Sequence, residues 1–202
     1  MEKTRCKWCN LDNELYVKYH DEEWGIPKFD NDYLFEMLIL ESFQAGLSWE
    51  TILNKREDFR TAFDDFDVDK VAKYDDEKIG ELMNNEKIIR HKLKITSAIN
   101  NAQIFKNILN EYGEFYDYLK TFTDGKIIYE ADQTKSKLSQ DISNDLKKRG
   151  MRFVGPVIIY SYLQAIGIIN SYYHFIMFFN LLFKFIFIIV KLFFFLNDYF
   201  II

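Results

Sequence analysis

The sequence LKKRGMRFVGP occupies residues 146–156, and a helical pattern lies on each side of this short connector. Gly150 and Gly155 bracket the connector, and glycine permits the positive φ angles that a tight turn needs. Amide groups left uncovered by the turn, with the N-terminus of a helix that begins at Pro156, form a site for a phosphate group. The stretch therefore predicts a helix-hairpin-helix element, which holds the backbone of DNA without reading its bases. The alternative is an ordinary turn between two helices.

The positive charge of this connector is a local feature. Lys147, Lys148, Arg149 and Arg152 lie within it, whereas the 202-residue chain has a net charge of −5. A negative chain is not attracted to nucleic acid as a whole, so any such binding must come from a local basic patch. We expect these four side chains and the two glycines to contact DNA. The alternative is that the basic residues only solvate a helix end.

Helical patterns dominate the rest of the chain. It contains two prolines and eight glycines, and strand patterns are few, so the sequence predicts an all-α fold. Residues 5–31 are aperiodic and are expected to form an ordered arm rather than a pair of helices. Helices are predicted at residues 32–44, 49–63, 87–112, 139–149 and 156–166, with short helices from Asp67 and Asp75 and a weak extended segment at 127–129.

One carboxylate is set among apolar residues. Glu41 follows the apolar run 37–40 and lies seven residues after Leu34, so both project from nearly the same side of a helix. Burial there raises the pKa of a carboxyl group unless a donor or a cation meets it. Such a group accepts hydrogen bonds from a bound base, stabilises a cationic ring or orients a water. The alternative is a side chain that turns outward near the helix end.

Aromatic residues gather in the same quarter of the sequence. Tyr19 and Trp49 lie on either side of Glu41, and Trp24 and Trp8 are further candidates for stacking against a ligand. Aromatic faces attract cations, so such a pocket suits a methylated purine that carries positive charge. Packing in the core is the alternative for each ring.

Thiol and imidazole groups cluster near the N-terminus. Cys6, Cys9 and His20 are of the types that bind zinc, but a closed structural site needs four ligands. His91 lies in a basic stretch and is expected at the surface, whereas His174 would join the cluster if the two ends of the chain meet. Two cysteines give no disulfide framework, and no apolar run follows the charged N-terminus, so we expect a cytoplasmic protein.

Several motifs follow one another over about residues 5–170. They are RCKW at 5–8, LY at 15–16, YHDEEWGIP at 19–27, LFEM at 34–37, LESFQAGLSW at 40–49, IIRH at 88–91, LKKRG and the residues up to Gly155 at 146–155, and YSYLQA at 160–165. Together these motifs resemble those of the DNA-3-methyladenine glycosylase I family.

The resemblance implies a helix-hairpin-helix DNA glycosylase that hydrolyses the N-glycosidic bond of 3-methyladenine in alkylated DNA and so begins base excision repair. Glu41 matches the carboxylate that recognises the base, Tyr19 and Trp49 match the rings that enclose it, and Trp24 lines the same pocket. Residues 156–159 include no aspartate, which agrees with the family, and we expect neither lyase activity nor a catalytic cofactor. The expected partner is double-stranded DNA with alkylated bases, bound by a monomer that needs no protein partner.

The family also ties its chain ends together with zinc, and this sequence departs from that pattern. Cys6 and His20 match the first pair of ligands, but Tyr172 stands at the aligned histidine position, with His174 two residues later and no cysteine after it. We therefore expect a zinc site formed by Cys6, His20 and His174 to lack its fourth ligand, with Cys9 as a candidate replacement. If this clasp and the activity are both lost, the alternative function is non-catalytic binding of damaged DNA.

The composition changes near the C-terminus, so we divide the chain into a glycosylase domain at 1–174 and a hydrophobic tail at 175–202. The tail consists almost wholly of Phe, Ile, Leu, Lys, Asn and Tyr, residues that codons of A and T alone encode, and this favours a shifted or read-through reading frame. A membrane anchor is a second hypothesis, opposed by Lys184 and Lys191, each costing about 2.5–3.5 kcal/mol near a bilayer centre. An unusual packing helix is the third. An uncovered tail predicts poor solubility.

Overall fold

The computed structural model describes residues 5–130 and 133–171, so the predicted domain boundary, the hydrophobic tail, Tyr172 and His174 lie outside the described residues. The elements follow one another as α1 (Glu14–Glu22), α2 (Asn31–Gln44), α3 (Trp49–Leu53), α4 (Arg56–Ala62), the 3₁₀ turn η1 (Asp64–Phe66), α5 (Val68–Val71), α6 (Asp76–Asn84), α7 (Lys92–Tyr112), α8 (Phe115–Thr123), β1 (Ile128–Tyr129), α9 (Lys137–Lys148), α10 (Pro156–Ala165) and β2 (Ile169–Asn170).

The predicted all-α fold is confirmed, and the differences lie in individual helices. The N-terminal arm contains α1, because the Asn13 side chain accepts a hydrogen bond from the Tyr16 amide and so caps a helix. The predicted helix at 87–112 begins only at Lys92, since the His91 side chain caps it. Helix α8 was not predicted, and the helix expected at 49–63 is divided into α3 and α4.

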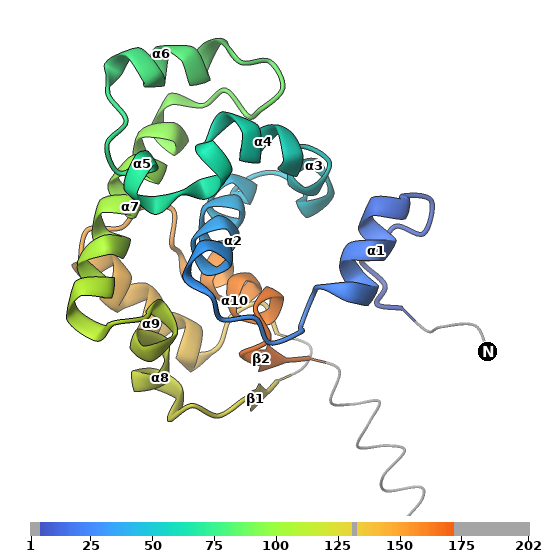
Figure 1. Cartoon of the computed structure of the whole chain (residues 1–202). Helices are drawn as coiled ribbons and strands as arrows, with labels where there is room; N and C mark the ends of the chain where they lie inside the picture. The colour runs from blue at the N-terminus through green and yellow to red at the C-terminus, as the bar shows by residue number, and fades with distance from the viewer. Residues whose placement is uncertain (1–4, 131–132, 172–202) are drawn as a thin grey trace, which may run out of the picture.

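Helix α2 forms the centre of the fold. Every residue from Tyr33 to Phe43 is buried, so this helix is covered on all sides rather than along one stripe. Helices α3, α7, α8 and α10 pack against it, and Figure 1 shows α10 directly beside it. The Tyr162 hydroxyl of α10 also donates a hydrogen bond to the Leu34 carbonyl at 3.2 Å. Because neighbouring helices pack around α2, the side chains in its last turn are held in fixed positions.

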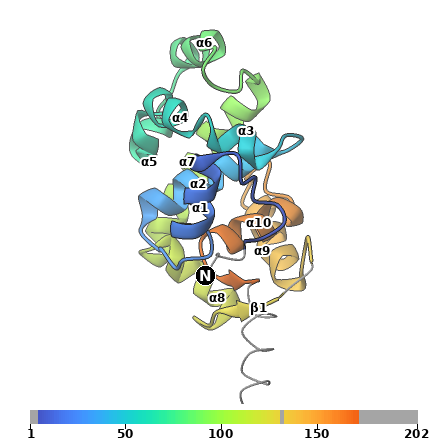
Figure 2. The ribbon, with the colours of Figure 1, turned by 90° about the vertical axis from the view of Figure 1, so that its right-hand side faces the viewer.

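The N-terminal arm rests on the end of α10 and the segment after it. The Gly25 amide donates a hydrogen bond to the Ala165 carbonyl at 3.2 Å. Gly167 has a φ of +76°, and a Cβ built on it would lie 2.6 Å from the Pro27 nitrogen. Strand β2 follows at once and pairs in parallel with β1, as Figure 2 shows at the base of the molecule. Residues far apart in the sequence therefore meet beside α10.

The contact between Gly167 and Pro27 gives a stability prediction. We expect Gly167→Ala to lower the free energy of unfolding by at least about 2 kcal/mol, because the new Cβ meets backbone and the left-handed conformation disfavours alanine. Gly80 is the matched control, since it lies inside α6 and a Cβ added to it would meet nothing within 4 Å. Gly80→Ala should raise stability by up to about 1 kcal/mol. Urea unfolding measures both, and equal effects of the two would contradict the close approach.

Candidate functional site

The predicted acidic and aromatic residues meet at one cavity. It has a volume of about 340 Å³ and lies among α1, α2, α3, α10 and the segment after β1. All five pocket residues expected from the sequence line it, namely Glu41, Tyr19, Trp49, Trp24 and Trp8. The structure therefore brings together side chains from the arm, from the central helix and from the turn that follows it.

Glu41 is the acidic group among the described residues that line this cavity. Its residue surface is 3% exposed, as expected from its place among apolar residues. Within the part of the chain that the structure describes, its Oε2 atom has no hydrogen-bond partner. Burial raises the pKa of Glu41 to about 8, because the charged form loses its hydration without gaining a donor. The carboxyl group is therefore protonated at neutral pH when the cavity holds no cation.

Two pairs of rings form the walls. The Tyr19 and Trp49 centroids lie 5.3 Å apart with an interplanar angle of 45°, and Trp8 meets Trp24 edge to face at 5.0 Å. Trp8 is 39% exposed and so lies at the rim. Burial raises the pKa of the Tyr19 hydroxyl, and the nearby Glu41 raises it further. This ring therefore stays neutral beside the carboxyl group.

The cavity also has residues that the sequence argument did not include. They are Tyr16, Gln44, Gln133, Ser161 and Gln164. Ser161 and Gln164 are three residues apart on α10, so they share a face, and Gln44 follows Glu41 by one turn of α2. The helical spacing in the sequence could therefore have indicated that Gln44, Ser161 and Gln164 face the cavity. Gln133 comes from the irregular segment after β1, where no periodicity indicates which side chains point inward.

Cys6 and His20 lie together, as the zinc prediction requires. The Cys6 amide donates to His20 Nε2 at 3.2 Å, and His20 Nδ1 lies 2.9 Å from Asp21 Oδ1. Arg5 binds both oxygens of Asp21. Within residues 5–130 and 133–171 no three His, Cys, Asp or Glu side chains are grouped to hold a metal. The donors described do not complete a zinc site, and the prediction for His174 concerns a residue outside them.

Cys9, the candidate replacement ligand, contacts the backbone of α1. Its side chain is buried and its Sγ lies 3.9 Å from the Tyr16 carbonyl oxygen, to which the thiol donates. Burial raises the pKa of the thiol, and a bound metal ion would have to favour the thiolate over this protonated form. His91, by contrast, is exposed as expected and caps α7.

The connector between α9 and α10 is a hairpin held against α7. The Asn101 side chain donates to the Arg152 carbonyl at 2.8 Å and accepts from the Arg152 amide at 2.9 Å. Gly150 has the expected positive φ of 101°. The expectation of positive φ at Gly155 is wrong, since its φ is −64° as the N-cap of α10. Phe153 takes the second positive φ, 54°, instead.

The cations of the hairpin differ in their surroundings. Lys147, Lys148 and Arg152 are exposed. Arg149 is bound by Glu111 at 2.5 Å and by Asp145 at 2.7 Å. Its charge is neutralised by these partners, so the structure gives Arg149 a role in fixing the hairpin that the sequence argument did not foresee.

No helix within residues 5–130 and 133–171 is both long enough and apolar enough to span a membrane. The hypothesis of a membrane anchor concerns the tail, which lies outside these ranges.

The chain matches the family model for methyladenine glycosylase over residues 8–177. It is 41% identical over 175 residues to DNA-3-methyladenine glycosylase 1 of Escherichia coli (strain K12), covering 83% of this chain and 92% of that protein. It is 39% identical over 176 residues to the DNA-3-methyladenine glycosylase of Haemophilus influenzae, covering 84% and 94%.

Solved structures agree with this match. A crystal structure of 3-methyladenine DNA glycosylase I superposes with a TM-score of 0.78 at 41% identity, covering 83% of this chain and 94% of that one. The Staphylococcus aureus 3-methyladenine DNA glycosylase I, solved to explain 3-methyladenine recognition, gives 0.76 at 37% identity, covering 79% and 88%.

Proposed function

Because the chain belongs to the methyladenine glycosylase family, it is a DNA glycosylase, and we propose that its base pocket removes 3-methyladenine from alkylated DNA by hydrolysis. The observation that carries the proposal is Glu41, a buried carboxyl group whose Oε2 has no partner in the described chain, inside a cavity walled by aromatic rings. A buried polar atom left unpaired costs free energy, so a ligand that pairs with it binds selectively.

The chemistry of the substrate determines what the protein must do. Methylation at N3 gives the purine a positive charge and makes it a good leaving group, so little acid catalysis is needed. The protein must extrude the nucleotide from the duplex, hold the cationic base and admit a water to the sugar. In the hydrolysis, water adds a hydroxyl group to the sugar carbon and releases its other proton to solvent, and the base takes the electrons of the glycosidic bond and leaves as neutral 3-methyladenine.

Glu41 is the group that we assign to recognition of the base. A cation brought into the cavity lowers the pKa of the carboxyl group, because the opposite charge favours ionisation. The resulting carboxylate accepts hydrogen bonds from the base and stabilises its charge. Tyr19 and Trp49 stack on the base faces, and Trp24 and Trp8 complete the wall.

The described residues that line the cavity include no lysine. A lyase step needs an amine nucleophile that forms a Schiff base with the sugar, so the lining supports a monofunctional hydrolase. Residues 156–159 at the start of α10 also supply no carboxylate. We propose that the protein acts as a cytoplasmic monomer on double-stranded DNA and needs no catalytic cofactor.

Release of 3-methyladenine from methylated duplex DNA by the full-length protein tests this function directly. We expect mass spectrometry to detect free 3-methyladenine, and no release from an unmethylated duplex. Binding to methylated DNA without release of the base would favour the alternative, a non-catalytic protein that recognises damage.

The hairpin is the part that we assign to the DNA backbone. Lys147, Lys148 and Arg152 are exposed there, and the amides of Phe153 and Gly155 make no hydrogen bond with the described chain. Cations and open amides bind phosphate in a way that is independent of sequence. Arg149 supports the hairpin through its own ion pairs.

Removing two of these cations should weaken DNA binding without changing base choice. We expect Lys147→Ala/Lys148→Ala to reduce the slope of log Kobs against log salt by roughly 2, because two phosphate contacts are lost. The loss should be equal for methylated and unmodified duplexes. Lys78→Ala is the control, since Lys78 lies on α6, which Figures 1 and 2 place at one end of the molecule, away from α9 and α10. An unchanged slope in the double variant would contradict the assigned surface.

A further inference from the structure

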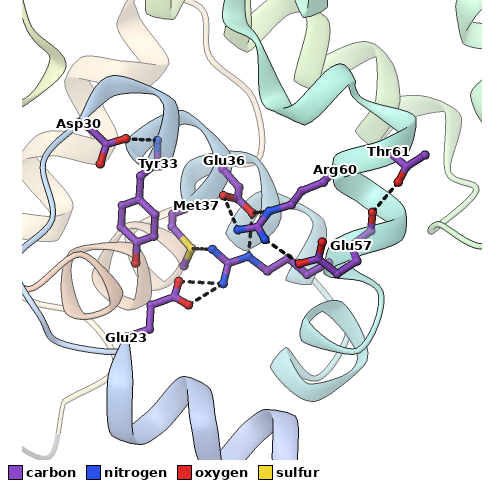
Figure 3. A network of polar contacts seen from close by, with 9 residues as sticks. Glu23, Asp30, Tyr33, Glu36, Met37, Glu57, Arg60 and Thr61 are labelled. Atoms are coloured by element: carbon purple, nitrogen blue, oxygen red, sulfur yellow. Dashed lines mark hydrogen bonds and ion pairs between the residues drawn. The ribbon is translucent and has the colours of Figure 1, made fainter.

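A buried ion-pair network joins the N-terminal arm to the helical body. Arg56 Nη1 donates to both oxygens of Glu23 at 2.7 and 2.8 Å, and Arg56 Nε donates to Glu36 Oε1 at 2.7 Å. Arg60 also donates to both oxygens of Glu36. Figure 3 shows Glu23 and Glu36 approaching from different elements, with Arg60 next to Glu36 and Glu57 beyond it. Arg56 therefore bridges the residue after α1 and the middle of α2.

Stability alone does not explain such a network. The side chains of Arg56 and Glu36 are 7% and 9% exposed. Burial would raise the pKa of Glu36, but hydrogen bonds from Arg56 and Arg60 outweigh it and lower that pKa. Removing two charges from water costs several kcal/mol per ion, and apolar residues of similar volume often serve stability equally well. A network of directional bonds does, however, fix the relative position of the elements that it joins.

The elements joined here carry the two halves of the base pocket. Tyr19 lies four residues before Glu23, one turn earlier on α1, and Trp24 directly follows Glu23. Glu36 lies five residues before Glu41 on α2. Tyr19 also lies between the base pocket and a second cavity of about 390 Å³, since it lines both. The walls of the second cavity include Glu23 and Arg56.

The start of α1 is held in a different way. The Asn13 and Asn10 side chains donate to Glu50 Oε1 at 2.8 and 2.9 Å, where α3 begins. At the C-terminal end of α1, the Glu23–Arg56 ion pair attaches the helix to the body in the same way. It lies closer in sequence to Tyr19 and Trp24 than these amide contacts do.

We propose that Arg56 is a positioning residue for base capture, acting through Glu23 to hold Tyr19 and Trp24 against Glu41 and Trp49. The inference rests on the proposed function, since it concerns how the pocket receives 3-methyladenine. Arg56 touches neither the base nor the sugar in this account. Its fork of donors fixes two carboxylates at once, which the single ammonium group of lysine does not reproduce.

The most direct test removes the Glu23–Arg56 ion pair and keeps the buried ion pair between Arg56 and Glu36. In Glu23→Ala, Arg56 remains paired with Glu36, and Glu23 itself is 29% exposed, so no buried charge is left alone. We expect about a tenfold loss in affinity for free 3-methyladenine, measured by quenching of tryptophan fluorescence, and a similar loss in the single-turnover rate of excision. Duplex affinity and the midpoint of urea unfolding should stay close to wild type, because the hairpin and core are unchanged.

Two further variants separate positioning from general damage. Glu57→Ala removes another carboxylate from the same network, but within the described chain Glu57 pairs only with Arg60 and its side chain is 81% exposed, so base affinity should not change. Glu23→Gln keeps an oxygen that accepts from Arg56 and should restore part of the affinity. Wild-type base affinity in Glu23→Ala would overturn the inference, as would a loss of affinity matched by an equal loss of unfolding free energy. If the wild-type protein itself neither binds nor releases 3-methyladenine, the proposed function fails instead, and this inference with it.

Discussion

Glu41→Gln is expected to lower the single-turnover rate of 3-methyladenine release roughly 100- to 1,000-fold, the usual cost of removing one preorganised electrostatic group from an active site. Glutamine keeps the size and shape of the side chain but is not able to ionise, so the charge that stabilises the cationic base is lost. Quenched-flow measurement of base release, with protein in excess over methylated duplex, gives this rate without a contribution from product release.

The specificity of this effect is checked against binding and against a neighbouring acid. Duplex affinity should change little, because the hairpin residues bind the backbone away from the cavity. Glu22→Gln is the matched control, since Glu22 lies on α1 and does not line the base pocket. Trp49→Ala should follow Glu41→Gln in losing excision far more than binding. Equal losses in excision and in duplex binding would count against the roles assigned to both residues.

The same Glu41→Gln substitution is expected to stabilise the protein in the absence of DNA, and increasingly so as the pH rises. Burial raises the pKa of Glu41 from an ordinary 4.5 to about 8. Below pH 4.5 both the folded and the unfolded chain carry the proton, so the group has no effect on stability. Between pH 4.5 and 8 only the folded state keeps the proton, and the free energy of unfolding falls by about 1.4 kcal/mol per pH unit. Above pH 8 the cost is complete.

Glutamine does not titrate, so the free energy of unfolding of the variant does not include this pH-dependent loss. The difference in unfolding free energy between variant and wild type should be small near pH 4.5 and reach several kcal/mol at pH 8, while contributions from other groups cancel. Urea titrations of both proteins at pH 5, 6.5 and 8 measure it. Parallel pH profiles would show that the carboxyl group meets water or a donor in the folded protein. A variant that gains stability and loses activity would mark Glu41 as a residue kept for function.

The burial of Glu41 was predictable because it depends on a single helix. The apolar residues at 34 and 37–40 specify which sides of α2 are covered, and Glu41 follows them in the helical period. The pocket roles of Tyr19 and Trp49 came instead from the family resemblance, because these rings lie on α1 and α3 and the periodicity of α2 does not place them. Helix α1 was missed because its signal is short and polar, and the Asn13 cap is a local bond that periodicity does not report.

Pairings between distant segments were beyond the reach of the sequence. Arg149 pairs with Glu111, which lies 38 residues earlier, and Arg56 pairs with Glu23, 33 residues earlier. Each of these arginines has many acidic residues within a similar separation, and no local pattern selects one of them. The motif around the hairpin showed where cations gather, but only the tertiary structure distinguishes the exposed lysines from the arginine that is already neutralised.

The docking of the N-terminal arm on residues 165–167 has a consequence for biosynthesis. The ribosome produces Gly25 and Pro27, which follow the pocket residues Tyr19 and Trp24, more than a hundred residues before Ala165 and Gly167, on which they rest. A nascent chain therefore contains the aromatic residues of the cavity before it contains the backbone on which the N-terminal arm packs. We therefore expect excision of a base only from chains whose synthesis has passed Gly167.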